Sequence, residues 1–115
     1  MVSLAGFREM ASSFEQAETS PHFEKESFRV KKKIFATLDL TRHRGTVRLS
    51  GVDQSVFCAI DPAIIYPVEG GWGRQGWTHV ELKKVKKDLL LDLLTTAYCT
   101  VAPPKLAAKY RPEQS

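Results

Sequence analysis

The sequence has little of what disulfide scaffolds and metal centres need, because only two of its 115 residues are cysteine. Cys58 and Cys99 lie far apart in the chain, each among apolar neighbours. Disulfide scaffolds use a denser set of cysteines, and a zinc site needs ligands at close spacing. We therefore expect both thiols to be small buried side chains in a reducing compartment, and we predict no metal site and no cofactor.

Long apolar runs are also missing. No stretch approaches the roughly 20 residues that cross a bilayer, and Arg8 and Glu9 precede any apolar segment of signal-peptide length. We expect a cytoplasmic protein with no membrane partner. The composition, 43% hydrophobic and 26% charged, is typical of a globular protein. The length suits one domain over residues 1–115, with a core over about 3–102 and a short tail over 103–115.

Catalytic constellations are equally sparse. Of the three histidines, only His79 lies on a predicted strand that carries an acidic residue, Glu81, on the same face at short spacing. No nucleophile or third ligand accompanies this pair, so an exposed cross-strand contact is the simpler interpretation. We predict no catalytic residues and a non-enzymatic protein.

One glycine-rich segment matches G-x-G-x-x-G, from Gly71 to Gly76. A dinucleotide fingerprint needs a strand before it and a helix after it, whereas here a strand beginning at Trp77 follows. We reject that interpretation and expect a loop. Trp72 stands between two glycines that cannot cover it, so Trp72 and Arg74 are candidates for contact with a ligand or a partner.

The net charge of +4 is unevenly distributed along the chain. Residues 27–48 carry seven bases and one acid, and residues 83–115 carry seven bases and three acids. The two segments 1–26 and 49–82 are each net −3. Positive charge is thus concentrated in two blocks, and a nucleic-acid interface would require the fold to bring them onto one face.

The periodicity of apolar residues predicts alternating helices and strands in the order α-β-β-β-α-β-α. The expected elements are a helix over 3–17, two strands within 27–38 joined by a lysine turn, a strand over 46–49 after a turn at Arg44-Gly45, a helix over 52–60, a strand over 77–82, a helix over 85–98 and a last helical turn over 105–110. Residues 62–76 are expected to be irregular. This order predicts an α+β fold, a two-layer sandwich in which helices pack on one face of an antiparallel sheet.

A series of short segments along the chain resembles the MmcQ/YjbR family of small bacterial proteins. The segments are Phe28-Arg29-Val30, Lys33-Ile34-Phe35-Ala36, Gly76-Trp77, Ala97-Tyr98 and Val101-Ala102-Pro103. The resemblance implies a compact fold similar to type III secretion chaperones, described as a double-wing arrangement. Members are commonly called DNA-binding, and the family supplies no catalytic residues. This chain departs from the family pattern in its Lys31-Lys32 turn and in the lysines over 83–87.

Two groups of basic residues are the candidate nucleic-acid contacts. The first comprises Lys31, Lys32 and Lys33 at a hairpin tip, with Arg42 and Arg44 near the following turn. The second precedes the last long helix and comprises Lys83, Lys84, Lys86 and Lys87. Phosphate contacts of this kind position a protein on DNA with low sequence specificity. The alternatives are lysines that protect a hairpin tip from edge pairing, and lysines that are simply solvated.

The sequence therefore favours a binding module that contacts DNA phosphate, as a monomer or a weak dimer. Two alternatives stay open. One is a chaperone-like module that binds another protein. The other is a small-ligand binder or enzyme that uses the Gly70–Gly76 loop.

Overall fold

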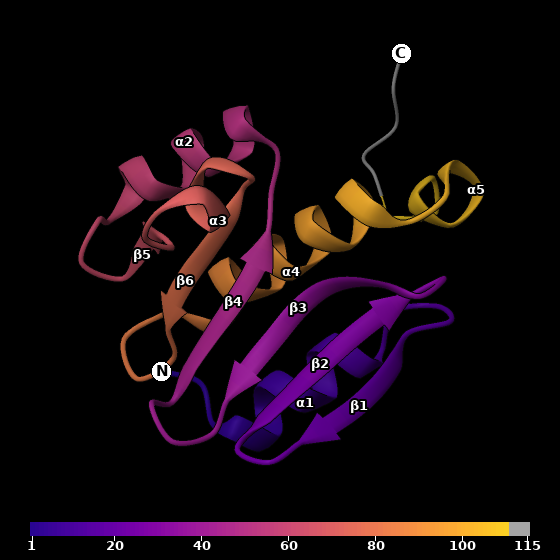
Figure 1. Cartoon of the computed structure of the whole chain (residues 1–115), viewed down its shortest axis with the longest axis horizontal. Helices are drawn as coiled ribbons and strands as arrows, with labels where there is room; N and C mark the ends of the chain where they lie inside the picture. Colours follow the sequence, from indigo (N-terminus) through magenta and orange to yellow (C-terminus); the bar gives the residue numbers. More distant parts are fainter. Residues whose placement is uncertain (111–115) are drawn as a thin grey trace.

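The computed structural model describes residues 1–110, so the end of the predicted tail lies outside the described residues. Within them, six antiparallel strands form one sheet in the order β1-β2-β3-β4-β6-β5 (Figure 1). The strands are β1 (Glu18–His22), β2 (Lys25–Val30), β3 (Lys33–Asp39), β4 (Arg44–Arg48), β5 (Ile65–Pro67) and β6 (Trp77–Glu81). The helices are α1 (Leu4–Ser12), α2 (Gly51–Ile60), α3 (Gly71–Arg74), α4 (Lys87–Val101) and α5 (Pro104–Ala107). The predicted α+β class with an antiparallel sheet is confirmed.

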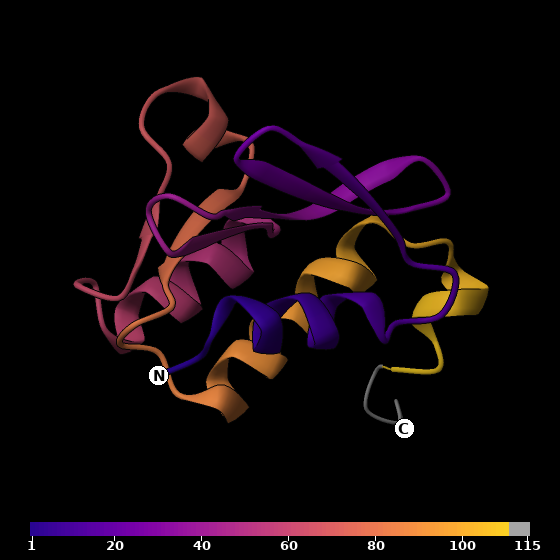
Figure 2. The same ribbon diagram turned by 90° about the horizontal axis from the view of Figure 1, so that it is seen from below.

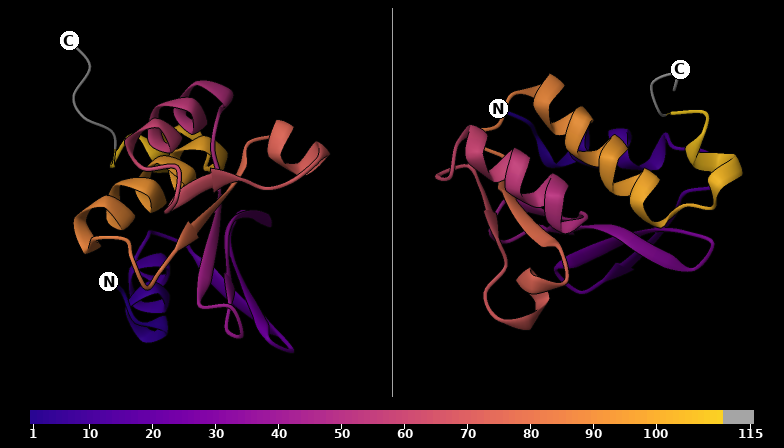
Figure 3. Two further views of the ribbon diagram at one scale, coloured as in Figure 1. Left: turned by 90° about the vertical axis from the view of Figure 1, so that its left-hand side faces the viewer. Right: turned by 90° about the horizontal axis from the view of Figure 1, so that it is seen from above.

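One face of the sheet is covered by α1 and α4, and α3 stands out from the other face (Figures 2 and 3). Alternate strand residues point into the covered side, where Phe28, Leu38 and Val80 are fully buried. Phe14 stacks on Tyr98 with ring centroids 4.9 Å apart, and both rings meet Phe35 edge to face. The hydrophobic core is therefore a dry aromatic and aliphatic layer on one side of the sheet.

The lysine turn between two strands is confirmed. Lys31 and Lys32 form the two-residue connection of β2 and β3, and both are left-handed, with φ of 50° and 69°. A two-residue loop with both φ values positive follows the twist of the flanking strands. Lysine has a Cβ and tolerates this conformation less well than glycine or asparagine, so the turn carries some backbone strain.

The N-terminal helix is shorter than predicted and is followed by a strand that the sequence analysis missed. The helix ends at Ser12, and Thr19, Ser20 and Pro21 belong to β1 rather than to a break. All five residues of β1 are exposed, so no apolar alternation marks them as a strand. Pro21 is tolerated because β1 is an edge strand.

The segment over 62–76, predicted to be irregular, contains two short elements. Strand β5 pairs with β6 at the other edge of the sheet, and α3 follows it as a single helical turn. The turn predicted at Arg44-Gly45 lies a few residues earlier, because both residues belong to β4 and His43 adopts the left-handed conformation that closes the turn.

Candidate functional site

The candidate basic residues lie at two opposite ends of the sheet. The Lys31-Lys32 turn precedes β3, and the turn that carries Arg42 follows it. Seven residues of extended strand separate the two turns by about 20 Å. Lys31–Lys33 and Arg42 therefore cannot contact one phosphate group together. Strand β3 separates the two parts of the first basic block, residues 27–48 (Figure 1).

The end of the sheet that carries Arg42 also carries the second block of lysines. Arg44 of β4 lies opposite Glu81 of β6, and the main-chain N–H of Leu82 donates to the carbonyl of His43 at 3.2 Å. His43 and Lys83 line the same hollow of about 490 Å³. We call this set of residues the basic edge: Arg42, Arg44, Lys83, Lys84, Lys86 and Lys87.

Hydrogen bonds to Asp39 fix Arg42, and an ion pair with Glu81 holds Arg44, whereas the lysines of the basic edge remain exposed. Asp39 accepts hydrogen bonds from the main-chain N–H of Arg42 at 3.0 Å and from its guanidinium at 3.1 Å. Burial opposes the charged form of Asp39, but these bonds and the charges of Arg42 and Lys25 hold its pKa below the ordinary value. Among residues 1–110, no ion pair engages the four lysines of the basic edge.

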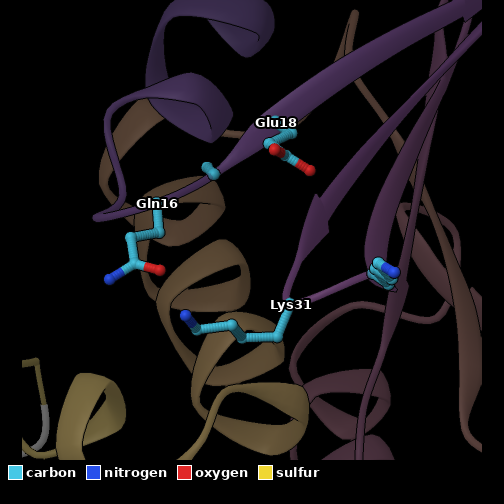
Figure 4. Close-up of a pocket in the computed structure, with 5 residues that line it drawn as sticks. Gln16, Glu18 and Lys31 are labelled. Atoms are coloured by element: carbon cyan, nitrogen blue, oxygen red, sulfur yellow. The ribbon is translucent and has the colours of Figure 1, made fainter.

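The lysines at the other end of the sheet face a different hollow. Lys31 and Lys32 line a space of about 390 Å³ together with Gln16, Ala17 and Glu18. Figure 4 shows Lys31 turning from the hairpin toward Gln16, on the side where the α1–β1 connection passes. The side chain of Lys31 thus extends along the molecule toward a neighbouring polar group, and Glu18 offsets part of the local positive charge.

The uncovered face of the sheet presents rows of polar side chains that cross the strands. One row alternates in charge, running Lys25, Asp39, Arg44, Glu81 from β2 to β6. The next row consists of hydroxyl groups followed by aromatic rings, running Ser20, Ser27, Thr37, Thr46, His79, Tyr66 from β1 to β5. A third row contains Arg48 opposite Trp77, with the guanidinium 5.8 Å from the indole centroid.

A hollow of about 340 Å³ lies on this uncovered face, and we call it the open-face hollow. Its lining combines apolar and polar side chains from β2, β3, β4, β6 and the β5–α3 segment: Lys25, Ile34, Thr37, Thr46, Val68, Trp72, Trp77 and His79. Small-molecule sites have this mixture, with apolar walls and a few converging polar groups. The hollow therefore joins the predicted ligand residue Trp72 to strand residues that the sequence analysis did not single out as ligand contacts.

His79 lies in the middle of this lining and is held there by its neighbours. Its Nδ1 shares a hydrogen bond of 2.9 Å with the hydroxyl of Thr46, and its ring packs against Tyr66. Burial lowers the pKa of His79 below 6.5, and the charges of Arg44 and Lys25 lower it further, against the opposing charge of Glu81. The imidazole is therefore neutral at pH 7, able to donate one hydrogen bond and accept another.

The position of Trp72 depends on contacts made by the ends of its short helix. The side-chain amide of Gln54, on α2, donates to the carbonyl of Gly73 at 2.9 Å and to the hydroxyl of Thr78 at 3.1 Å. A Cβ on Gly73 would lie 1.9 Å from the carbonyl oxygen of Val68. Gly73 is thus needed for close packing against Val68, which gives the glycine-rich segment a structural role in place of the rejected dinucleotide motif. The side chain of Trp72 is 62% exposed.

Other predicted site features are placed apart from the hollow. Arg74 is exposed at the end of α3 and does not belong to the lining.

Cys99 is buried and Cys58 is half-buried, and burial raises the pKa of the Cys58 thiol, which disfavours the reactive thiolate. Within residues 1–110, no cluster of three His, Cys, Asp or Glu side chains could hold a metal ion. No helix in the same range has the length and apolar character needed to cross a membrane.

The missed residues of the hollow have a recognisable but weak sequence signal. Thr46, His79 and Trp77 each alternate with a buried neighbour along a strand, so their shared face follows from period-two alternation. Which strands are adjacent is set by the sheet order, in which β6 pairs with both β4 and β5. Sequence spacing does not supply that order, so the hollow could not be assembled from the sequence alone.

The sheet, backed by helices on one face and open on the other, defines the class of the protein as a two-layer α+β module. The family model of YjbR matches residues 12–100, and the chain belongs to the YjbR family. The crystal structure of protein DR2400 from Deinococcus radiodurans, which has a DUF419 domain, is similar in fold with a TM-score of 0.78. It shares 21% identity, over 96% of this chain and 86% of that chain. A search of curated proteins finds no match.

Proposed function

We propose that the protein is a non-enzymatic binding module that contacts the phosphates of nucleic acid through the basic edge. The observation that carries this proposal is the convergence of residues 42–44 and 83–87 at one end of the sheet, joined by the Leu82–His43 hydrogen bond. Segments that lie about 40 residues apart in the chain thereby contribute cations to one surface. Because Asp39 and Glu81 pair with Arg42 and Arg44, the excess positive charge of this surface comes from its four lysines. Their concentration at one place raises the local positive potential above what a net charge of +4 spread over the chain would create.

The chemistry of the lysines supports phosphate contact rather than a structural role. Lys83, Lys84, Lys86 and Lys87 are all exposed, and their ammonium groups have no ion-pair partner among residues 1–110. Val85, in their midst, is fully buried and anchors the segment to the core. The lysines are thus presented from a fixed backbone, and contacts to phosphate would bind nucleic acid with low sequence specificity.

A salt titration of duplex binding tests the proposal. Affinity measured by fluorescence anisotropy should fall linearly on a log–log plot, with a slope near −0.9 for each phosphate neutralised. Lys83→Glu with Lys84→Glu should weaken binding and flatten the slope by about two. Lys105→Glu, on α5, is the matched control and should leave the slope unchanged. The absence of duplex binding at about 50 mM salt contradicts the proposal.

The hairpin lysines provide a second arm of the same experiment. Because Lys31 and Lys32 lie at the opposite end of the sheet, Lys31→Glu with Lys32→Glu reports whether a bound duplex spans the molecule. An unchanged slope in this variant, with a reduced slope in the Lys83–Lys84 variant, assigns binding to the basic edge alone.

Protein binding is a second candidate function, favoured by the outer face of α2. Val52, Val56 and Ile60 recur every four residues along this helix and are 75%, 58% and 57% exposed. An apolar stripe of this kind suits a weak dimer rather than a stable one, because specific interfaces bury about 1,200–2,000 Å². Analytical ultracentrifugation should show concentration-dependent self-association that Val56→Asp abolishes. A strictly monomeric wild-type protein would exclude this dimer.

A further inference from the structure

The lining of the open-face hollow changes in chemistry along the strands. The end formed by Ile34 and Trp77 is apolar and aromatic, the middle holds Thr37, Thr46 and His79, and beyond it lie Asp39, Arg44 and Glu81. Successive rows are two residues, or about 7 Å, apart along a strand. The charged row adjoins the basic edge, because Arg44 belongs to both. A ligand that follows the strands would meet aromatic rings first and then hydroxyl groups. It would next meet the alternating charges of Asp39, Arg44 and Glu81, and beyond this row the lysines of the basic edge.

We propose that the open-face hollow binds the nucleoside part of an unpaired nucleotide, with the base at the tryptophan end and the phosphate directed toward the basic edge. This inference rests on the proposed function, since it uses the basic edge as the phosphate-binding end. In a nucleotide a flat ring is followed by a hydroxyl-bearing sugar and then by an anion. The lining offers an aromatic row and then a hydroxyl row in the same order, and the lysines of the basic edge lie past the mixed charges of the third row.

Trp72 provides a stacking surface that is already held in position. Gln54 fixes α3, the helix that carries Trp72, through its hydrogen bond to Gly73. The main-chain N–H of Val68 donates to the carbonyl of Trp77 at 3.0 Å and holds the segment before α3 against β6. An indole carried on a fixed backbone has only its own two side-chain torsions to order on binding. Every base has a π-face, so stacking on Trp72 would accept any base.

The size of the hollow favours a single unpaired nucleotide. A volume of about 340 Å³ lies at the lower end of the range for small-molecule sites, about 300–1,000 Å³. A paired base is stacked inside the duplex, so its ring is not available to Trp72. The hollow should therefore distinguish single strands from duplexes, whereas the basic edge should bind both.

Charges around the hollow favour an anionic ligand over a neutral aromatic one. Lys25 lines the hollow, and neither it nor Arg48 has an ion-pair partner among residues 1–110. Arg29, which lies opposite Ile34 on the neighbouring strand, has a buried Nε without a hydrogen-bond partner in the same range. Neutral His79 can donate to or accept from a sugar or base without adding a further charge.

The experiment compares binding of a labelled single strand and a duplex of equal length by anisotropy at about 50 mM salt. Trp72→Ala should weaken single-strand binding about tenfold and leave duplex binding and both salt slopes unchanged. Trp72→Phe keeps a ring and should retain single-strand affinity within about threefold. Leu91→Ala removes an apolar side chain that is 45% exposed on α4, outside both proposed binding surfaces, and is the matched control. Equal urea midpoints for the four proteins exclude a folding defect.

A titration with free mononucleotide shows whether the hollow binds a small nucleotide or a nucleotide that is part of a single strand. Titration with adenosine monophosphate, followed by the NMR signals of the Trp72 and Trp77 indoles, should shift both signals in the wild type. If the mononucleotide binds and neither strand does, the hollow is supported as a small-nucleotide site while the proposed function fails. If strands bind but Trp72→Ala is without effect on single-strand affinity, the hollow proposal is overturned and the function of the basic edge stands. Absence of all binding overturns both.

Discussion

The two faces of the sheet are built from the same strands and differ in nearly every property. On the covered face, Phe35 and its buried neighbours form a dry layer with the aromatic rings of α1 and α4. On the uncovered face, Thr37, two residues further along the same strand, lines a hollow with histidine, lysine and tryptophan. Phe35 and Thr37 face opposite sides although they are two residues apart, because a β-bulge opposite Phe28 and Arg29 makes Phe35 an extra residue of β3 on the covered side. Outside the bulge, period-two alternation separates buried from solvent-facing side chains within single strands. The covered face should respond to substitution through unfolding free energy, and the uncovered face through ligand affinity.

The largest expected effect is on the covered face. Phe35→Ala should lower the free energy of unfolding by about 3–5 kcal/mol, because it deletes a fully buried ring that contacts both Phe14 and Tyr98. Thr37→Ala, on the same strand, is the matched control and should change it by no more than about 0.5 kcal/mol. Urea denaturation measures both. Comparable losses of unfolding free energy in the two variants would show that the uncovered face contributes as much to stability as the covered face.

The next effect concerns the loop that holds Trp72 above the uncovered face. A Cβ on Gly76 would lie 1.8 Å from the carbonyl oxygen of Leu49, and the residue has φ of 103°. Gly76→Ala should therefore cost about 2–4 kcal/mol of unfolding free energy, by clash and backbone strain together. Gly51→Ala, where nothing lies within 4 Å of the added Cβ, is the control and should be neutral or slightly stabilising. An unaffected Gly76→Ala protein would contradict the packing of this loop.

The sequence predicts the covered face better than the uncovered one, for a physical reason. Burial leaves a periodic apolar signal, and this signal identifies most of the helices and strands that contact the core. Strand β1 leaves no such signal because all its residues are exposed, and α3 is too short to show periodicity. The basic edge likewise depends on the pairing of β4 with β6, which follows from the complete sheet and not from local sequence.

A smaller effect is expected at the ion pair that closes the charged row of the uncovered face. The Nε of Arg44 lies 3.5 Å from Glu81, whose carboxylate also accepts a hydrogen bond from the hydroxyl of Tyr66. Both side chains remain about a quarter exposed, so solvent screens their attraction. A double-mutant cycle with Arg44→Met and Glu81→Gln should give a coupling energy below about 1 kcal/mol. Coupling above about 2 kcal/mol would mean that this row stabilises the fold as strongly as core contacts do.

The smallest effect on stability is the pH dependence contributed by His79. Burial, with Arg44 and Lys25, lowers the folded-state pKa below the ordinary 6.5, and Glu81 and Asp39 only partly oppose this. Between the folded and unfolded pKa values the unfolded chain binds more protons, so this contribution to stability is present above pH 6.5 and is lost as the pH falls through the folded pKa.

Urea titrations at pH 7.5 and 5.5 measure this dependence when wild type is compared with His79→Gln, which removes the titrating group. The wild type should lose more stability on acidification than the variant, because the other histidines and the carboxylates titrate equally in both. NMR titration of the His79 ring gives the folded pKa directly. Equal losses in the two proteins, or a ring that titrates at or above pH 6.5, would show that burial does not disfavour the charged form of His79 in the folded protein.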